Sequence, residues 1–89
     1  MTITIPYTDQ RLRVLTEEYL TQQRGAFTLQ GLCSYILYWA MEEAPAPGLY
    51  TGCQIAPGDA ARVSRVLEQI VAEGRIAARG EGEFEKAEN

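Results

Sequence analysis

Three stretches of the chain carry apolar residues at the spacing of an amphipathic α-helix. The first covers residues 9–24, with Thr8 as a candidate N-cap and Gly25 as a candidate stop. The second covers residues 29–43 after a second candidate cap, Thr28, and is the most regular of the three. Its apolar positions follow the i, i+3, i+4, i+7 pattern and are Leu29, Leu32, Cys33, Ile36, Leu37 and Ala40.

The third helical stretch covers residues 59–73, with Asp59 as a candidate N-cap and Gly74 as a stop. Two short alternating segments then flank a glycine-rich turn, which predicts a β-hairpin over residues 75–86 with Ile76 and Phe84 facing the core. The residues that we expect in one common core are Leu15, Leu32, Ile36, Val63, Val66, Leu67, Ile70 and Phe84.

Outside these elements the pattern is less regular. Residues 1–6 alternate threonine with isoleucine, which suits a short strand or an extended arm. Residues 42–58 are rich in proline and glycine and predict a long loop, with a short strand around Gln54. Residues 87–89 are expected to be a solvated tail. A chain of 89 residues has enough material for one core, so residues 1–89 are expected to form a single α+β domain.

Composition narrows the class of protein. The chain is 46% hydrophobic and 22% charged, which is ordinary for a globular domain. No apolar run approaches the roughly 20 residues that span a bilayer, and the first residues lack the pattern of a signal peptide, so we expect a cytoplasmic protein. A reduced pair is then expected for the two cysteines, with Cys33 as a small buried hydrophobe and Cys53 in a loop open to a redox or contact role.

The segment DAARVSRVLEQIVAEGRIAARGEGEFEK, residues 59–86, resembles the recognition helix and wing of winged-helix proteins, in which an amphipathic helix ends in a Gly-Arg/Lys-Ile step into a hairpin. With the two helices expected before it, the order helix, helix, helix, hairpin resembles that family over residues 8–86. The resemblance implies a small winged-helix-like fold. It also implies a DNA-binding or transcription-regulatory module, because the third helix of that family usually lies in the major groove.

Carried over residue by residue, the resemblance nominates one side of the third helix and the base of the wing for contacts with DNA. The candidate residues are Arg62, Ser64, Arg65 and Gln69 on the helix, and Arg75 and Arg79 in the wing. Arginine and glutamine suit this role because they form bidentate hydrogen bonds with the edges of guanine and adenine. The alternative is that these side chains are solvated, or paired at helical spacing with Glu68 or Glu73.

The charge and the spacing of the helices depart from the pattern of a DNA-binding winged helix. The net charge is −4, which argues against an indiscriminate nucleic-acid binder but not against a specific one. The expected hairpin carries Glu81, Glu83 and Glu85, and residues 59–89 hold seven acidic side chains against five basic ones. Residues 42–58 also stand where a helix-turn-helix has a turn of a few residues.

The alternative function is a non-catalytic module for protein–protein interaction or oligomerisation that does not bind DNA. Tyr35, Tyr38 and Trp39 widen the apolar surface of the second helix, which suits either a central helix or a face for a partner or a second copy. A strand at residues 2–5 could also extend a partner's sheet. No enzyme, metal site or cofactor is expected, because the chain has no histidine, no CxxC pair and no phosphate-binding loop.

Overall fold

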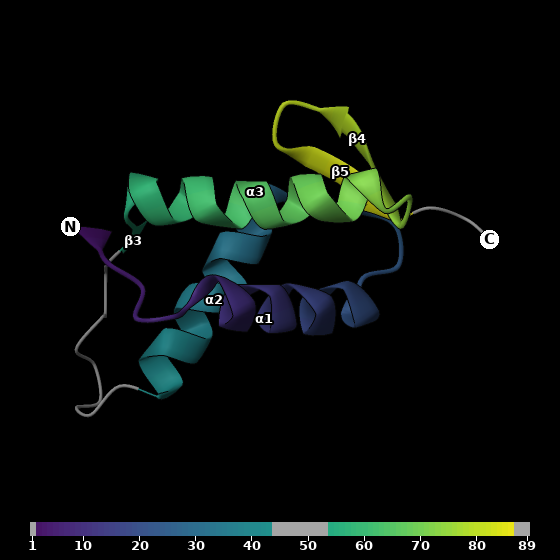
Figure 1. Ribbon diagram of the computed structural model, residues 1–89. Helices are drawn as coiled ribbons and strands as arrows, with labels where there is room; N and C mark the ends of the chain where they lie inside the picture. The colour runs from purple at the N-terminus through teal and green to yellow at the C-terminus, as the bar shows by residue number, and fades with distance from the viewer. Residues whose placement is uncertain (1, 44–53, 87–89) are drawn as a thin grey trace.

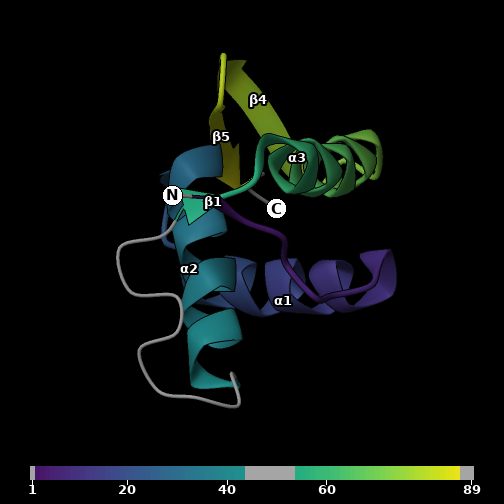
Figure 2. The ribbon, with the colours of Figure 1, turned by 90° about the vertical axis from the view of Figure 1, so that its left-hand side faces the viewer.

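The computed structural model describes residues 2–43 and 54–86 of the chain (Figure 1). In order, its elements are β1 (Thr2–Ile3), α1 (Asp9–Gln22), β2 (Ala26–Thr28), α2 (Leu29–Glu42), β3 (Gln54–Ile55), α3 (Pro57–Ala72), β4 (Ile76–Gly80) and β5 (Glu83–Lys86). Figures 1 and 2 show α1 and α3 running alongside each other, with α2 crossing them and the β4–β5 hairpin rising at the end of α3. The domain is α+β, with three helices followed by a C-terminal β-hairpin, as the sequence predicts.

The first two helices begin where their caps predict. The hydroxyl of Thr8 accepts a hydrogen bond from the backbone N–H of Arg11, and the hydroxyl of Thr28 accepts one from Gly31. Helix α1 ends at Gln22, two residues before the predicted end, because Gln23 already adopts an extended conformation. From there the chain leads into β2.

Strand β2 was not predicted from the sequence, yet it completes the sheet. It pairs antiparallel with β5, and β5 pairs antiparallel with β4, so the strand order is β2-β5-β4. Phe27 lies directly opposite Phe84, and both side chains are buried. The hairpin is confirmed, and its turn contains Gly82 with φ of +71°, a left-handed conformation that glycine adopts without steric cost.

The start of α3 corrects one prediction. The helix begins at Pro57 with Ala56 at the N-cap position and no side-chain cap, so the prediction of Asp59 as N-cap is wrong. Proline suits the first helical turn because its φ is already helical and its missing N–H has no partner there. Asp59 is instead buried within the first turn. The predicted stop is confirmed, since Gly74 follows the C-cap Glu73 with φ of +78°.

The N-terminal strand is confirmed and has a partner within the chain. Thr2 pairs with Gln54 and Ile3 with Ile55 in a parallel two-stranded sheet, which also confirms the short strand expected around Gln54. The predicted loop 42–58 is shorter at its ends, because Glu42 belongs to α2 and Pro57 to α3. Residues 44–53 of it, including Cys53, lie outside the described residues, as does the tail at 87–89.

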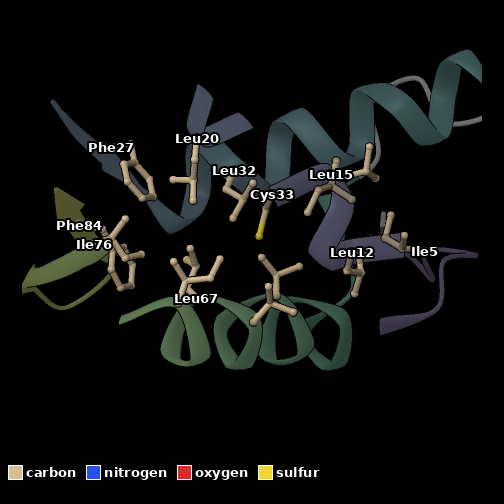
Figure 3. Packing of buried hydrophobic residues seen from close by; sticks show 14 of the residues in the cluster. Ile5, Leu12, Leu15, Leu20, Phe27, Leu32, Cys33, Leu67, Ile76 and Phe84 are labelled. Carbon is tan, nitrogen blue, oxygen red and sulfur yellow. The ribbon is translucent and has the colours of Figure 1, made fainter. Parts of the chain in front are cut away.

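All three helices and the sheet share one core, shown in Figure 3. Every core residue predicted from the sequence is buried, with Leu15, Leu32, Ile36, Val63, Leu67 and Ile70 fully inaccessible. Seven further residues complete the same cluster, namely Ile5, Leu12, Leu20, Phe27, Cys33, Ala40 and Ile76. Among the described residues, the helices are all too short or too polar to cross a membrane.

Candidate interaction surfaces

Arg62, a candidate DNA contact on the third helix, lies in a polar cluster at the N-terminal end of α3. Its Nη1 donates to Asp59 Oδ1 at 2.8 Å, its Nε donates to Asp9 Oδ1 at 2.9 Å, and its Nη2 donates to the carbonyl oxygen of Tyr7. The second carboxylate oxygen of Asp59 accepts the backbone N–H of Ile5 at 2.7 Å. The hydrogen bonds that the guanidinium donates to Asp9 and then to Asp59 raise its pKa. Arg62 therefore fastens the N-terminal segment and the start of α1 to α3.

A second charged cluster lies at the other end of the same helix pair. Arg75, a candidate wing contact, donates to Glu17 at 2.7 Å and lies 3.6 Å from Glu73. Arg13 donates to Glu73 at 2.7 Å and lies 3.6 Å from Glu17, so two arginines and two glutamates form a closed ring. The hydrogen bond from Arg13 lowers the pKa of Glu73, and the bond to Glu17 raises that of Arg75. This ring joins α1 to the start of β4.

The β4–β5 hairpin carries more acidic than basic side chains. Arg79, the second candidate wing contact, forms an ion pair across the hairpin with Glu85 at 2.7 Å. Glu81 and Glu83 are exposed at the turn and the start of β5. Lys86 Nζ donates to the backbone carbonyl of Gln23 at 3.2 Å, which holds it against the end of α1. The surface of the hairpin therefore offers phosphate groups little attraction.

The outward side of α3 retains two of the nominated residues. Arg65 and Gln69 are exposed, whereas Ser64 is half-buried. Their exposed neighbours on the same helix are Ala61, Glu68 and Ala72. Arg65 has no carboxylate within ion-pair distance among residues 2–43 and 54–86. Because Arg62, Arg75 and Arg79 are each paired elsewhere, the six candidates do not assemble into a positive stripe.

The aromatic residues of α2 divide into packed and exposed rings. Tyr35 and Trp39 are half-buried and belong to a run of ring contacts with centroid distances of 5.1 to 6.4 Å. Along this run the rings are Phe84, Phe27, Tyr19, Tyr35, Trp39 and Tyr38. Tyr38 ends the run, and 54% of its surface is exposed. For Tyr35 and Trp39 the packing corresponds to a central helix, whereas Tyr38 is available to a partner.

Helix α2 has an outward face without charge. From Leu29 to Met41 its sequence contains no aspartate, glutamate, lysine or arginine. We define the uncharged α2 face as Gln30, Ser34, Leu37, Tyr38 and Met41, all of them exposed except the half-buried Leu37. Beside Tyr38 this face contains a hollow of about 300 Å³ against β3, lined by Gln30, Cys33, Ser34, Leu37, Gln54 and Ile55. Of these five residues the sequence nominated only Tyr38 as a contact for a partner.

The chemistry available at these surfaces is limited. Burial raises the pKa of the Cys33 thiol to about 11, so at neutral pH it is protonated and a poor nucleophile. Among the described residues no three histidine, cysteine, aspartate or glutamate side chains lie close enough together to hold a metal ion. Cys53, the other cysteine of the sequence, lies outside the described residues.

Comparisons of the chain with protein-family models, with curated proteins and with solved structures found no match. What the domain can bind therefore has to follow from the distribution of charge and exposed side chains over its own elements. Two surfaces stand out on those grounds, namely the charged side of α3 and the uncharged α2 face.

Proposed function

We propose that this chain is a non-catalytic protein-interaction module of winged-helix-like layout, which contacts another polypeptide through the uncharged α2 face. In this proposal α3 holds the domain together and does not read DNA. The observation that carries the proposal is the contrast between Arg62, whose guanidinium is bound to two carboxylates, and Tyr38, which is 54% exposed on a face without charge.

The amount of free positive charge supports this assignment. A protein gains affinity for DNA by placing lysine and arginine against phosphates and releasing the bound counterions. Three of the four nominated arginines already neutralise carboxylates of the same chain, and Arg65 is the one without an ion pair among the described residues. Moving Arg62 to a phosphate would also leave Asp59, which is buried, without its cation.

The character of the α2 face supports a protein partner. Interface centres are depleted in charged residues and enriched in tyrosine, tryptophan and methionine. The uncharged α2 face has an exposed tyrosine and an exposed methionine, with the neutral polar groups of Gln30 and Ser34 between them. An uncharged surface of this kind excludes water at little desolvation cost, since no ion has to be stripped of its hydration.

DNA binding is the second candidate, and one observation favours it. Arg65 and Gln69 are exposed on the third helix of a winged-helix-like fold, at the position where such a helix meets a base edge. We therefore expect any DNA binding to depend on these two side chains and not on Arg62 or Arg75.

The test is a fluorescence-anisotropy titration of mixed-sequence duplex DNA at low ionic strength. We expect no salt-dependent binding by the wild-type protein up to high micromolar concentration, and the same result for a double variant, Arg65→Ala with Gln69→Ala. Binding by the wild type that weakens with added salt and is lost in the double variant would instead establish DNA recognition by α3. The double variant keeps the buried face of α3, so it should fold like the wild type. A loss of binding would then report the loss of the two side chains and not of the fold.

A further inference from the structure

The chain before α1 is held by two side chains of α3. We call residues 2–7 the N-terminal strap, and Figure 2 shows its purple chain descending from β1, beside α2, to α1. The carboxylate of Asp59 accepts the backbone N–H of Ile5 at 2.7 Å, and the guanidinium of Arg62 donates to the carbonyl oxygen of Tyr7. The same guanidinium donates to Asp59 at 2.8 Å, so one polar cluster holds the strap at two points.

The strap places more of its side chains in solvent than in the core. Thr2, Thr4 and Pro6 are exposed, and Tyr7 is half-buried. Ile5, by contrast, is buried in the common core. A segment with few buried side chains opens at a lower free energy than a core helix, which opens only when the whole domain unfolds. Release of the strap therefore leaves most of the core that α1, α2 and α3 share.

The strap also holds β3. Thr2 pairs with Gln54 and Ile3 with Ile55, and within residues 2–43 and 54–86 no other strand pairs with β3. A two-stranded ladder as short as this one has little stability of its own. Gln54 and Ile55 line the hollow of about 300 Å³ on the uncharged α2 face. One wall of that hollow therefore depends on the position of the strap.

We infer that the N-terminal strap and β3 open together as one unit while the three helices stay packed, and that Arg62 controls this opening. The hollow beside α2 then has a closed and an open state. A partner that binds the closed hollow stabilises β3, so its binding and closure of the strap favour each other. This consequence for binding rests on the proposed function, whereas the opening itself depends only on the fold.

Arg62 controls the opening because two contacts of the strap depend on its guanidinium. The first is its own hydrogen bond to the carbonyl oxygen of Tyr7. The second is the bond from Ile5 to Asp59, whose side chain is only 7% exposed and is paired with Arg62. Without this cation the carboxylate is a buried charge that gains by turning towards water, which weakens its hold on Ile5.

Two probes in the full chain can follow the two parts of the unit separately. Native-state hydrogen exchange of the Ile5 amide, measured by NMR, reports the strap. Cys33 lines the hollow together with β3 and is only 7% exposed, so alkylation of its thiol by excess N-ethylmaleimide reports the opening of β3. Cys53→Ser removes the second thiol of the sequence and gives the reference protein.

In the reference protein we expect both probes to react through an opening that is more frequent than global unfolding. Exchange of the Ile5 amide and alkylation of Cys33 should depend only weakly on added urea, because opening of the strap exposes little surface. The amide of Leu67, in the core of α3, should exchange more slowly and with a steep dependence on urea.

Variants of three arginines test the role of the cluster. Arg62→Ala should accelerate Ile5 exchange and Cys33 alkylation together, by about tenfold or more, because three hydrogen bonds are lost. Arg65→Ala removes an exposed arginine of the same helix, and Arg13→Ala breaks the charged ring at the other end of α1 and α3. Both control variants should leave the two rates within about twofold of the reference.

Three outcomes would overturn the inference. Exchange of Ile5 only together with Leu67 would mean that the strap opens only by global unfolding, and this result needs the reference protein alone. Faster Ile5 exchange without faster Cys33 alkylation in Arg62→Ala would separate β3 from the strap. Equal acceleration by Arg13→Ala would remove the special role of Arg62. Failure of the proposed function has a different signature, namely the salt-dependent DNA binding that the anisotropy titration measures.

Discussion

The second and third helices are close in length, 14 and 16 residues, and both place one face in the shared core. Their outward sides differ. Helix α3 carries two acids and two arginines, with Arg62 engaged in holding α1 and the N-terminal segment, whereas the single charge of α2 is Glu42 at its end. A helix that is apolar or neutral on most of its circumference is either buried all round or covered by a partner. For α2 the exposed Tyr38 and Met41 exclude the first situation, which is why we propose a partner on this side.

The difference between the two helices also shows how this domain uses its charged side chains. On α3, cations are used within the chain, and the ion pairs join segments that are far apart in sequence, such as Arg62 and Asp9. On α2, the absence of charged side chains leaves a surface that binds water only weakly. A sequence motif that places arginines on the third helix is therefore no measure of the positive charge available to an external partner.

The largest expected effect concerns the buried side of α3. Leu67 is fully inaccessible and lies between the helices in the core. Leu67→Ala should lower the free energy of unfolding by about 2–5 kcal/mol, because it removes burial and leaves a cavity. In a domain of this size such a loss can abolish the folded state at room temperature. Urea denaturation followed by circular dichroism measures it, with Val14→Ala as the exposed control. An unfolding midpoint equal to that of the control would contradict the burial of Leu67.

A smaller loss of stability is expected to distinguish two arginines of α3. Arg62→Ala removes the cation from the buried Asp59 and three hydrogen bonds, so we expect a loss of about 1–3 kcal/mol. Arg65→Ala removes an exposed arginine without an ion-pair partner among the described residues and should change stability by less than about 0.5 kcal/mol. Equal midpoints for the two variants in thermal unfolding would show that the Arg62 cluster does not hold the fold.

The helices and the core were predictable because their signals are local. Thr8 and Thr28 cap the helices that follow them, and the apolar spacing of residues such as Leu32 and Ile36 identifies the buried face. Strand β2 escaped prediction because it has three residues and one buried side chain, Phe27. Its signal is the pairing with Phe84 at the other end of the chain, which no local pattern contains.

The long-range ion pairs of the arginines could not be predicted from the sequence for the same reason. Helical spacing suggests partners three or four residues away, and it does account for the pair of Arg62 with Asp59. The contact with Asp9 and the contact of Arg75 with Glu17 join residues 53 and 58 positions apart, and they depend on how α1 packs against α3. The hollow beside Tyr38 depends likewise on β3 and its place against α2.

The smallest expected effect is a pH dependence at the end of α3. The hydrogen bond from Arg13 lowers the pKa of the Glu73 carboxyl in the folded protein, so folding favours its ionised form. This contribution to stability is fully present above the pKa of glutamate in the unfolded chain and is lost as the pH falls through the lower, folded value. Glu73→Gln should therefore have a lower melting temperature than the wild type at neutral pH, and the difference should shrink as the solution is acidified below the ordinary range of glutamate.

Glu68→Gln is the matched control for that prediction, because Glu68 lies on the same helix, is exposed, and has no arginine within ion-pair distance in the described part of the chain. Its melting temperature should follow that of the wild type at every pH. Added salt should reduce the effect of Glu73→Gln at neutral pH, since the ring of Arg13, Glu17, Glu73 and Arg75 is open to solvent and its charges are screened. Scanning calorimetry from neutral to acidic pH measures both variants, and a constant difference between Glu73→Gln and the wild type across that range would mean that the carboxylate does not hold α1 to the end of α3 by its charge.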